Sequence, residues 1–337
     1  MATVDVFVPC YNYGRFLREC VESILTQEGV AVRVLILDDC STDESSDVGL
    51  ALAAADPRVE YRRHDVNRGH IATYNEGIDW AAGDYTMLLS ADDMLTQGAF
   101  LRAVRVMEAH PEVGFVYGRH IRFINRRDII VEPGQYTPRI EIRTGPRWLE
   151  RICELGFNPI ACPEVLARTA LQKEVGGYTV ELPHTGDMEM WMRYAARTSV
   201  GFIDCIQAYY RVHGGNMSST LAPGMADQLD PCWKAFCFFF ERDGDLVPDA
   251  RRLRRLAGNT IAQETLSYAY NFACSEEPAR ARLLLSMAQE ICPASQWRRL
   301  YISTRLRLIL GPRLATKLGR LWRWIRFKVN LPKIGGR

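Results

Sequence analysis

Residues 87–95 read MLLSADDML, an apolar run typical of a buried strand, which ends in two adjacent aspartates. Like charges repel, so Asp92 and Asp93 need a reason to stand side by side. One explanation is a turn into a helix over 96–110, with Thr96 as the N-cap residue. The other is a site for a hard divalent cation, because such cations prefer carboxylate oxygens. The sequence around the doublet decides between these explanations.

Short apolar runs alternate with helical patterns along the first 90 residues. The apolar runs predict buried strands over 4–9, 32–38, 59–63 and 85–90, and helical patterns lie between them over 15–27, 43–55 and 70–81. The alternation predicts βαβ units and a Rossmann-like, mostly parallel sheet flanked by helices, an α/β fold. Further strands are expected over 114–125, 164–168 and 200–211, with helices over 148–155 and 187–197. Ligands of such sheets bind beyond the carboxyl ends of the strands, where 9–12, 38–43 and 90–93 fall.

Length and composition predict how the 337 residues are divided. An apolar content of 47% fits a domain over residues 1–220 and a helical C-terminal region over 221–337. The ten cysteines are scattered without metal-ligand spacing, so we expect reduced and mostly buried thiols. The start MATVDVFVP lacks a signal-peptide pattern, and no run of 18 uncharged apolar residues occurs. We therefore expect a cytoplasmic protein.

The charge of the chain is concentrated at its C-terminal end. Residues 293–337 contain twelve of the 42 basic residues and no acidic residue, which leaves 30 basic against 40 acidic residues before them. A helical stripe within this tail is flanked by arginine and lysine and consists of Leu314, Leu318, Leu321, Trp322 and Ile325. This pattern predicts a helix on an anionic membrane surface, at the inner face of the membrane. The alternative is a terminal helix packed on the body; nucleic-acid binding is not expected.

Five sequence blocks occur in a fixed order: VFVPCYNYGRFLRECVESILTQ, LILDDCSTDES, NRGHIATYNEGIDWAAGDYTMLLSADD, GGYTVELPHTGDMEMWMRYA and YYRVHGGNMS. Together they resemble glycosyltransferase family 2, the nucleotide-sugar transferases with a GT-A fold. The resemblance covers residues 4 to about 218. It implies a GT-A sheet with a C-terminal helical extension, and a nucleoside diphosphate sugar as donor.

The resemblance also implies a set of nucleotide-binding residues: Pro9, Tyr11, Asn12, Asp38, Asp39, Arg68, Ala72, Ala91 and Asp92. An aspartate at the end of the second strand can accept a hydrogen bond from a base N–H or a ribose hydroxyl. The alternative for this stretch is a turn through Asp39, Ser41 and Asp43 that caps the next helix. Arg68 could screen negative charge near the nucleotide.

The aspartate doublet matches the end of the Asp-x-Asp element of the family, although Ser90 stands where many members have the first aspartate. The resemblance implies a Mn²⁺ or Mg²⁺ ion held by Asp92, Asp93 and His213. Which aspartate binds the metal and which contacts ribose is left open. Such an ion stabilises the charge that develops on a diphosphate leaving group.

The run DMEMWMRYA begins with Asp187, which matches the catalytic-base position of the family. A carboxylate there could accept the proton of the acceptor hydroxyl, with Glu189 as the second candidate, and a plain helix cap is the alternative. A base without a nucleophile implies one displacement, with inversion at the sugar carbon. The chain lacks the Gln-x-x-Arg-Trp element of polymer-extending members, so we expect non-processive transfer.

The expected function is that of an inverting, metal-dependent glycosyltransferase of polysaccharide biosynthesis. The donor is expected to be a UDP-sugar, and the acceptor a hydroxyl of a saccharide or a lipid-linked saccharide. Two alternatives stay open. A catalytically silent scaffold protein could keep the fold and dock on membranes, which Ser90 favours, or a nucleotidyltransferase could read a nucleotide at the same sheet edge and release pyrophosphate.

Overall fold

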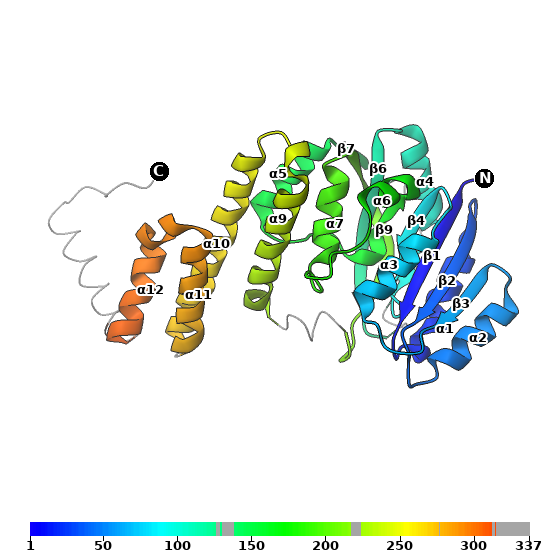
Figure 1. The fold of residues 1–337 in the computed structure, drawn as a ribbon, viewed down its shortest axis with the longest axis horizontal. Helices are drawn as coiled ribbons and strands as arrows, with labels where there is room; N and C mark the ends of the chain where they lie inside the picture. Colours follow the sequence, from blue (N-terminus) through cyan, green and yellow to red (C-terminus); the bar gives the residue numbers. More distant parts are fainter. Residues whose placement is uncertain (126–128, 130–137, 217–223, 276, 312–313, 315–337) are drawn as a thin grey trace.

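The computed structural model describes residues 1–125, 129, 138–216, 224–275, 277–311 and 314 (Figure 1). Its N-terminal part is a parallel sheet with the strand order β3-β2-β1-β4. The four strands are β1 (Thr3–Cys10), β2 (Ala31–Asp38), β3 (Val59–Arg63) and β4 (Tyr85–Leu88). Cys10 pairs with Asp38 and Asp38 with Arg63, so these strands end at one common edge.

Helices cover both faces of this parallel sheet. Successive strand residues point to opposite faces, and Val6 therefore belongs to one hydrophobic cluster and Phe7 to the other. The Val6 face is covered by α1 (Gly14–Leu25), and α2 (Ser45–Ala55) packs beside α1. The Phe7 face is covered by α3 (His70–Trp80). The predicted βαβ alternation is confirmed here.

Among the described residues the sheet has nine strands in all, five of them beyond β4. Next to β4 lies β8 (Leu166–Arg168), antiparallel to β4 and to β6 (Val113–Phe123). Beyond β6 lies β9 (Ser199–Arg211), which runs parallel to β6. Two short strands, β5 (Met94–Leu95) and β7 (Ile140–Arg143), pair with β9 in the antiparallel direction. The strand ends of β6 and β9 thus extend the same edge that β1 and β4 begin.

Four more helices pack on the extended sheet: α4 (Ala99–Ala109), α5 (Gly145–Leu155), α6 (Thr169–Val175) and α7 (Gly186–Ala195). The expected N-cap of α4 is wrong. Gly98, in the left-handed conformation, precedes the helix, and no side chain caps it. The Thr96 hydroxyl instead donates to the carbonyl oxygen of Ile206 on β9 at 2.8 Å. The pairing of β5 with β9 places Thr96 beside β9 and explains the difference.

The C-terminal region of the described chain is helical, as predicted, and consists of α9 (Leu229–Asp243), α10 (Ala250–Cys274), α11 (Pro278–Ile291) and α12 (Arg299–Leu310). Phe236 of α9 and Ile261 of α10 belong to the same buried cluster as Trp148 of α5 and Trp191 of α7. The core is therefore continuous from the sheet into α9 and α10. A domain boundary near residue 220 stays a prediction.

The structure bears on the expectations about the cysteines, about membrane-spanning helices and about the basic tail. All ten cysteines are free thiols, but only four are buried, because several lie on helix faces and loops near the surface. Within the described part of the chain, no helix combines the length and apolar character needed to cross a bilayer. The predicted tail stripe lies outside the described residues except for Leu314, whose side chain is exposed.

Candidate active site

The residues expected to bind nucleotide, metal and acceptor gather along the carboxyl edge of the sheet. They lie at and after the end of β1 (Pro9, Tyr11, Asn12), at and after the end of β2 (Asp38, Asp39), just before and in the first turn of α3 (Arg68, Ala72), after β4 (Ala91, Asp92, Asp93), after β9 (His213) and at the start of α7 (Asp187). The sheet order places the β1 and β2 ends on one side of the doublet and the β9 end on the other.

The two aspartates at the end of β2 are bound tightly into the protein. Asp38 is fully buried, and its carboxylate accepts hydrogen bonds from the Ser41 N–H at 2.8 Å and the Tyr61 hydroxyl at 2.7 Å. The Asp39 carboxylate lies 2.7 Å from His64 Nδ1 and accepts from the N–H groups of residues 68 and 69. These bonds favour the turn interpretation of the stretch, and a contact with a nucleobase would compete with them.

The loop after β1 is joined to the loop after β2. Asn12 has a positive φ of 59°, and its side-chain oxygen accepts from the Thr42 N–H at 2.8 Å. The Asn12 N–H donates to the Ser41 hydroxyl at 2.9 Å. Beside this join, the Tyr11 side chain is 48% exposed, while Pro9 is partly buried within the strand. Tyr11 therefore offers an accessible aromatic ring where the resemblance expects a nucleoside.

Arg68 and Ala72 lie around the start of α3. The Arg68 guanidinium, just before α3, donates to Glu76 on α3 at 2.8 Å, so its charge is partly neutralised. Ala72 is partly exposed on the first turn. The expected contacts of both residues with nucleotide stay predictions.

The doublet after β4 is bonded to the end of β9. Asp93 Oδ1 accepts from the Arg211 N–H at 2.9 Å, and Arg211 Nε donates to the Asp92 carbonyl oxygen at 2.8 Å. Burial and the charge of Asp92 raise the pKa of Asp93 well above its usual range. Ala91, which precedes the doublet, is fully buried. The two strand ends therefore share a centre of poorly compensated negative charge.

His213 lies directly on the doublet. Its Nε2 is 3.0 Å from Asp92 Oδ2, and Asn216 Nδ2 donates to the same oxygen at 3.2 Å. Because the Gly215 N–H donates to His213 Nδ1 at 3.1 Å, the neutral ring carries its proton on Nε2 and donates it to Asp92. The ring also stands edge-on to Tyr13, at 5.4 Å between ring centroids. Two side chains of the loop after β9 thus meet one carboxylate oxygen of the doublet.

These residues fit a divalent cation that is shared with a diphosphate. Asp92 and His213 present one carboxylate oxygen and one imidazole nitrogen side by side, and Mg²⁺ commonly takes one or two carboxylates together with substrate phosphates. Imidazole is a good ligand for manganese-like ions once Nε2 has lost its proton. Among the described residues, no group of three His, Cys, Asp or Glu side chains is arranged to hold a metal alone.

Asp187 lies in the first turn of α7 and is partly buried. Desolvation raises the pKa of its carboxyl to about 6, although a hydrogen bond with Tyr178 acts in the opposite direction. The cap alternative finds no support, because no side chain caps α7. Glu189, the second candidate base, is fully buried and paired with Arg193 at 2.9 Å. Asp187 is therefore the carboxylate of α7 that is poised to exchange a proton near neutral pH.

The structure adds residues that sequence reasoning did not single out. Arg211 and Asn216 donate hydrogen bonds to the doublet. Both lie in the block YYRVHGGNMS, and that block was the only sequence feature that could have pointed to them. Tyr178 contacts Asp187, and Asn75 of α3 binds its backbone through both amide atoms, accepting from the N–H at 2.7 Å and donating to the carbonyl at 3.2 Å. A side chain at Gly177 would collide with Asn75, at 2.6 Å from Oδ1.

Comparisons with solved structures identify the class of fold. TarS residues 1–349 of S. aureus, in complex with UDP-GlcNAc, superimpose with a TM-score of 0.65 and 17% identity, over 95% of this chain and 92% of that one. The mannosyltransferase PcManGT of Pyrobaculum calidifontis, in complex with GDP-Man and Mn²⁺, gives a TM-score of 0.52 and 17% identity over 95% and 87%. The fold is that of the GT-A glycosyltransferases, which confirms the predicted fold class.

The family follows from the sequence comparison. Residues 5–155 match the model of glycosyl transferase family 2, which confirms the predicted resemblance to this family over that part of the chain. A protein of Nostoc sp. named as an uncharacterised glycosyltransferase is 26% identical over 67% of this chain and 69% of its own length. An uncharacterised protein of Sinorhizobium fredii is 34% identical over 58% of this chain. The latter match spans only 20% of that longer protein.

Proposed function

We propose that this protein is an inverting glycosyltransferase that moves a sugar from a nucleoside diphosphate to a hydroxyl of a saccharide or a lipid-linked saccharide. The observation that carries the proposal is that Asp187 and the aspartate doublet both act on one side chain, that of Cys162. The Cys162 thiol has a pKa raised by burial and by the negative charges of both Asp187 and Asp93. One partly buried side chain, which also contacts the Leu88 carbonyl oxygen at the end of β4, thus lies within the electrostatic reach of both acidic centres, as transfer between a diphosphate and an acceptor requires.

The donor in this proposal is a uridine diphosphate sugar. Two of the TarS structures, with TM-scores of 0.65 and 0.62, are complexes with UDP-GlcNAc and UDP, whereas PcManGT, with a TM-score of 0.52, holds GDP-Man. The nucleoside would lie over the ends of β1 and β2, with the exposed ring of Tyr11 stacked on the base. Asp38 and Asp39 would act mainly by holding the loops that shape this site.

Asp92 and His213 would hold a Mn²⁺ or Mg²⁺ ion together with the diphosphate. Of the doublet, Asp92 is the better placed, because its Oδ2 faces His213 while Asp93 Oδ1 accepts from the Arg211 backbone. When bound, the ion supplies stabilisation of the negative charge on the leaving diphosphate. Asp93 is then the candidate for the ribose contact.

Asp187 accepts the acceptor proton in this mechanism. The acceptor oxygen forms a bond to the anomeric carbon, the bond from that carbon to the diphosphate oxygen breaks, and its electron pair leaves with the diphosphate. The proton of the acceptor hydroxyl moves to the Asp187 carboxylate, whose pKa of about 6 suits a base at neutral pH. A single displacement inverts the anomeric carbon, and one sugar is added per encounter.

Calorimetric titration with UDP, GDP and dTDP tests the proposal. We expect one nucleotide, UDP, to bind when Mn²⁺ is present and to bind much more weakly after chelation with EDTA. Absence of binding by all three under both conditions would contradict the proposal and favour a scaffold protein. Product analysis separates the remaining alternative, because glycosyl transfer releases a nucleoside diphosphate and nucleotidyl transfer releases pyrophosphate.

A further inference from the structure

The helix α12 presents two different faces. Its inner face contacts α10, and Tyr301 and Thr304 on that face are buried. Its outer face carries large apolar side chains in contact with solvent: Ile302 at 47%, Leu306 at 47%, Ile309 at 70% and Leu310 at 36% exposure. The spacing 302, 306 and 309 is that of one continuous stripe along an α-helix. Burial of such a stripe is favourable, so the face is suited to a binding partner.

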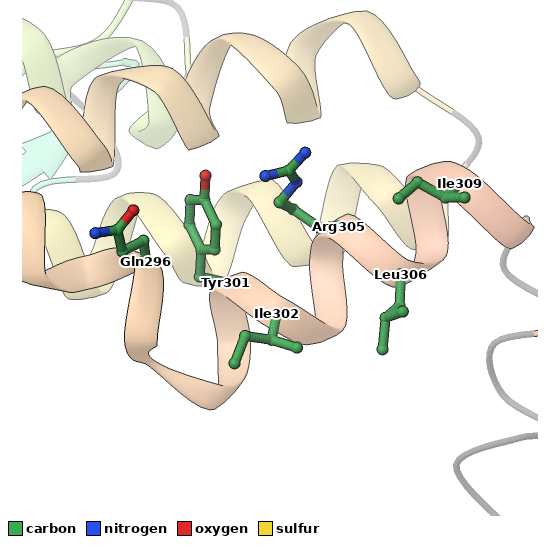
Figure 2. A pocket seen from close by; sticks show the side chains of 6 residues that line it. All are labelled: Gln296, Tyr301, Ile302, Arg305, Leu306 and Ile309. Carbon is green, nitrogen blue, oxygen red and sulfur yellow. The ribbon is translucent and has the colours of Figure 1, made fainter.

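The outer face also contains a shallow hollow. It has a volume of about 270 Å³ and is lined by Gln296, Tyr301, Ile302, Arg305, Leu306 and Ile309. Figure 2 shows that Ile302 and Leu306 point away from the neighbouring helices, whereas Tyr301 and Arg305 point toward them. The hollow is thus open on its apolar side. Its lining contains one cation and no acidic side chain.

The charged residues of this segment of the chain have a single sign. Arg299 and Arg305 are exposed on α12, and the whole sequence from 293 to 337 contains basic but no acidic residues. An apolar stripe with basic flanks matches a surface that offers both hydrocarbon and negative charge. Anionic phospholipid provides both, whereas a nucleic acid provides only the charge.

We propose that the outer face of α12 docks on an anionic phospholipid surface, with the apolar stripe in the interface and the positive charge of the nearby exposed arginines attracting the lipid phosphates. The twelve residues of α12 span about 18 Å, which is shorter than the roughly 30 Å hydrocarbon core, so the helix lies along the surface. This docking goes beyond sugar transfer and does not depend on it. It would hold the enzyme where lipid-linked acceptors are found.

Co-sedimentation of the full chain with vesicles tests the docking without nucleotide or metal. We expect binding to vesicles of phosphatidylcholine with about 30% phosphatidylglycerol, little binding to pure phosphatidylcholine, and a steep loss as salt rises from about 50 to 500 mM. Equal binding to both vesicle types, or no binding to either, would overturn the proposal.

Substitutions locate the binding on α12. The double variant Ile302→Ser/Leu306→Ser should weaken partitioning at least about tenfold, because two apolar side chains leave the interface. Arg305→Gln should weaken it about fivefold. The matched controls are Leu50→Ser, whose side chain is 56% exposed on α2, and Arg18→Gln, exposed on α1; both lie at the opposite end of the molecule (Figure 1) and should bind as the unsubstituted chain does.

If something other than a lipid surface binds the outer face of α12, the same variants give a different result for each alternative. Unchanged vesicle binding by the double variant would assign binding to residues beyond α12 and overturn the proposal. A dimer that dissociates in the double variant, measured by light scattering, would assign the face to a second copy of the chain. Binding of an RNA oligonucleotide in competition with anionic vesicles, lost in Arg305→Gln but kept in the double serine variant, would assign it to a polyanion.

Discussion

Two pairs of adjacent aspartates end two strands on either side of β1, and their surroundings differ. Asp38 and Asp39, after β2, accept hydrogen bonds from backbone N–H groups and neighbouring side chains that hold the first two loops of the edge. Asp92 and Asp93, after β4, instead join β4 to the end of β9. Burial and mutual charge raise the pKa of Asp93. The first pair thus contributes to structure, and the second pair leaves negative charge that a cation can stabilise.

Asp92→Asn should give the largest effect of the second aspartate pair on sugar transfer. The substitution removes a charged metal ligand, so sugar transfer should fall about 10²–10³-fold, measured as nucleoside diphosphate released per minute. The melting temperature should stay the same or rise, since repulsion between the two carboxylates is relieved. Full activity in this variant would contradict the metal-binding role that sets the second pair apart from the first.

Asp38→Ala should show the opposite behaviour. It leaves the Ser41 N–H and the Tyr61 hydroxyl without their buried acceptor, so the free energy of unfolding should fall by about 2–4 kcal/mol in urea denaturation. UDP affinity of the folded fraction should change little. A stable variant that no longer binds UDP would instead show that Asp38 contacts the base.

The pH dependence of turnover tests the role of Asp187, the candidate base near the second aspartate pair. A base must be unprotonated to accept a proton, and the pKa of Asp187 is about 6. The rate at saturating substrate should therefore rise with pH up to about 6 and level off above it, with a fall of about tenfold per unit below. Thermal unfolding over the same range serves as the control. A rate that is flat through pH 6 would contradict the assignment of Asp187.

Tyr11→Ala tests the loops beside the first aspartate pair, and its expected effect on UDP binding is the smallest. Loss of a stacked ring should raise the Kd for UDP about fivefold to tenfold in calorimetry. Tyr11→Phe keeps the ring and should bind UDP as the unsubstituted chain does. Equal affinity in all three proteins would mean that the nucleoside does not contact this ring.

Much of the fold could be predicted because its signals are local. The strand expected over 32–38 is β2 at Ala31–Asp38, and the helix expected over 70–81 is α3 at His70–Trp80. The strands β5 and β7 and the helix α6 were not predicted. β5 has only two residues and α6 only seven, and β7 is partly exposed without an apolar run. Their existence depends on pairing or packing with distant elements.

The candidate site was predicted as a set of residues but not as a set of contacts. The ordered blocks identified Asp92, Asp187 and His213. The bond between His213 and Asp92 joins residues 121 positions apart, and that between Asn75 and Tyr178 joins residues 103 positions apart. No local sequence pattern predicts contacts between residues so far apart. The hydrogen bonds that Asp39 accepts and the pairing of Glu189 with Arg193 are therefore visible only in the folded chain.

The central claim is that Asp187 serves the chemical step while the strand-end residues bind the donor. The most direct measurement compares Asp187→Asn with the unsubstituted protein in two assays, turnover of a UDP-sugar and calorimetric binding of UDP with Mn²⁺. The account predicts a loss of turnover of about 10²–10⁴-fold with an unchanged Kd for UDP. Retained turnover, or a loss of UDP binding as large as the loss of turnover, would contradict it.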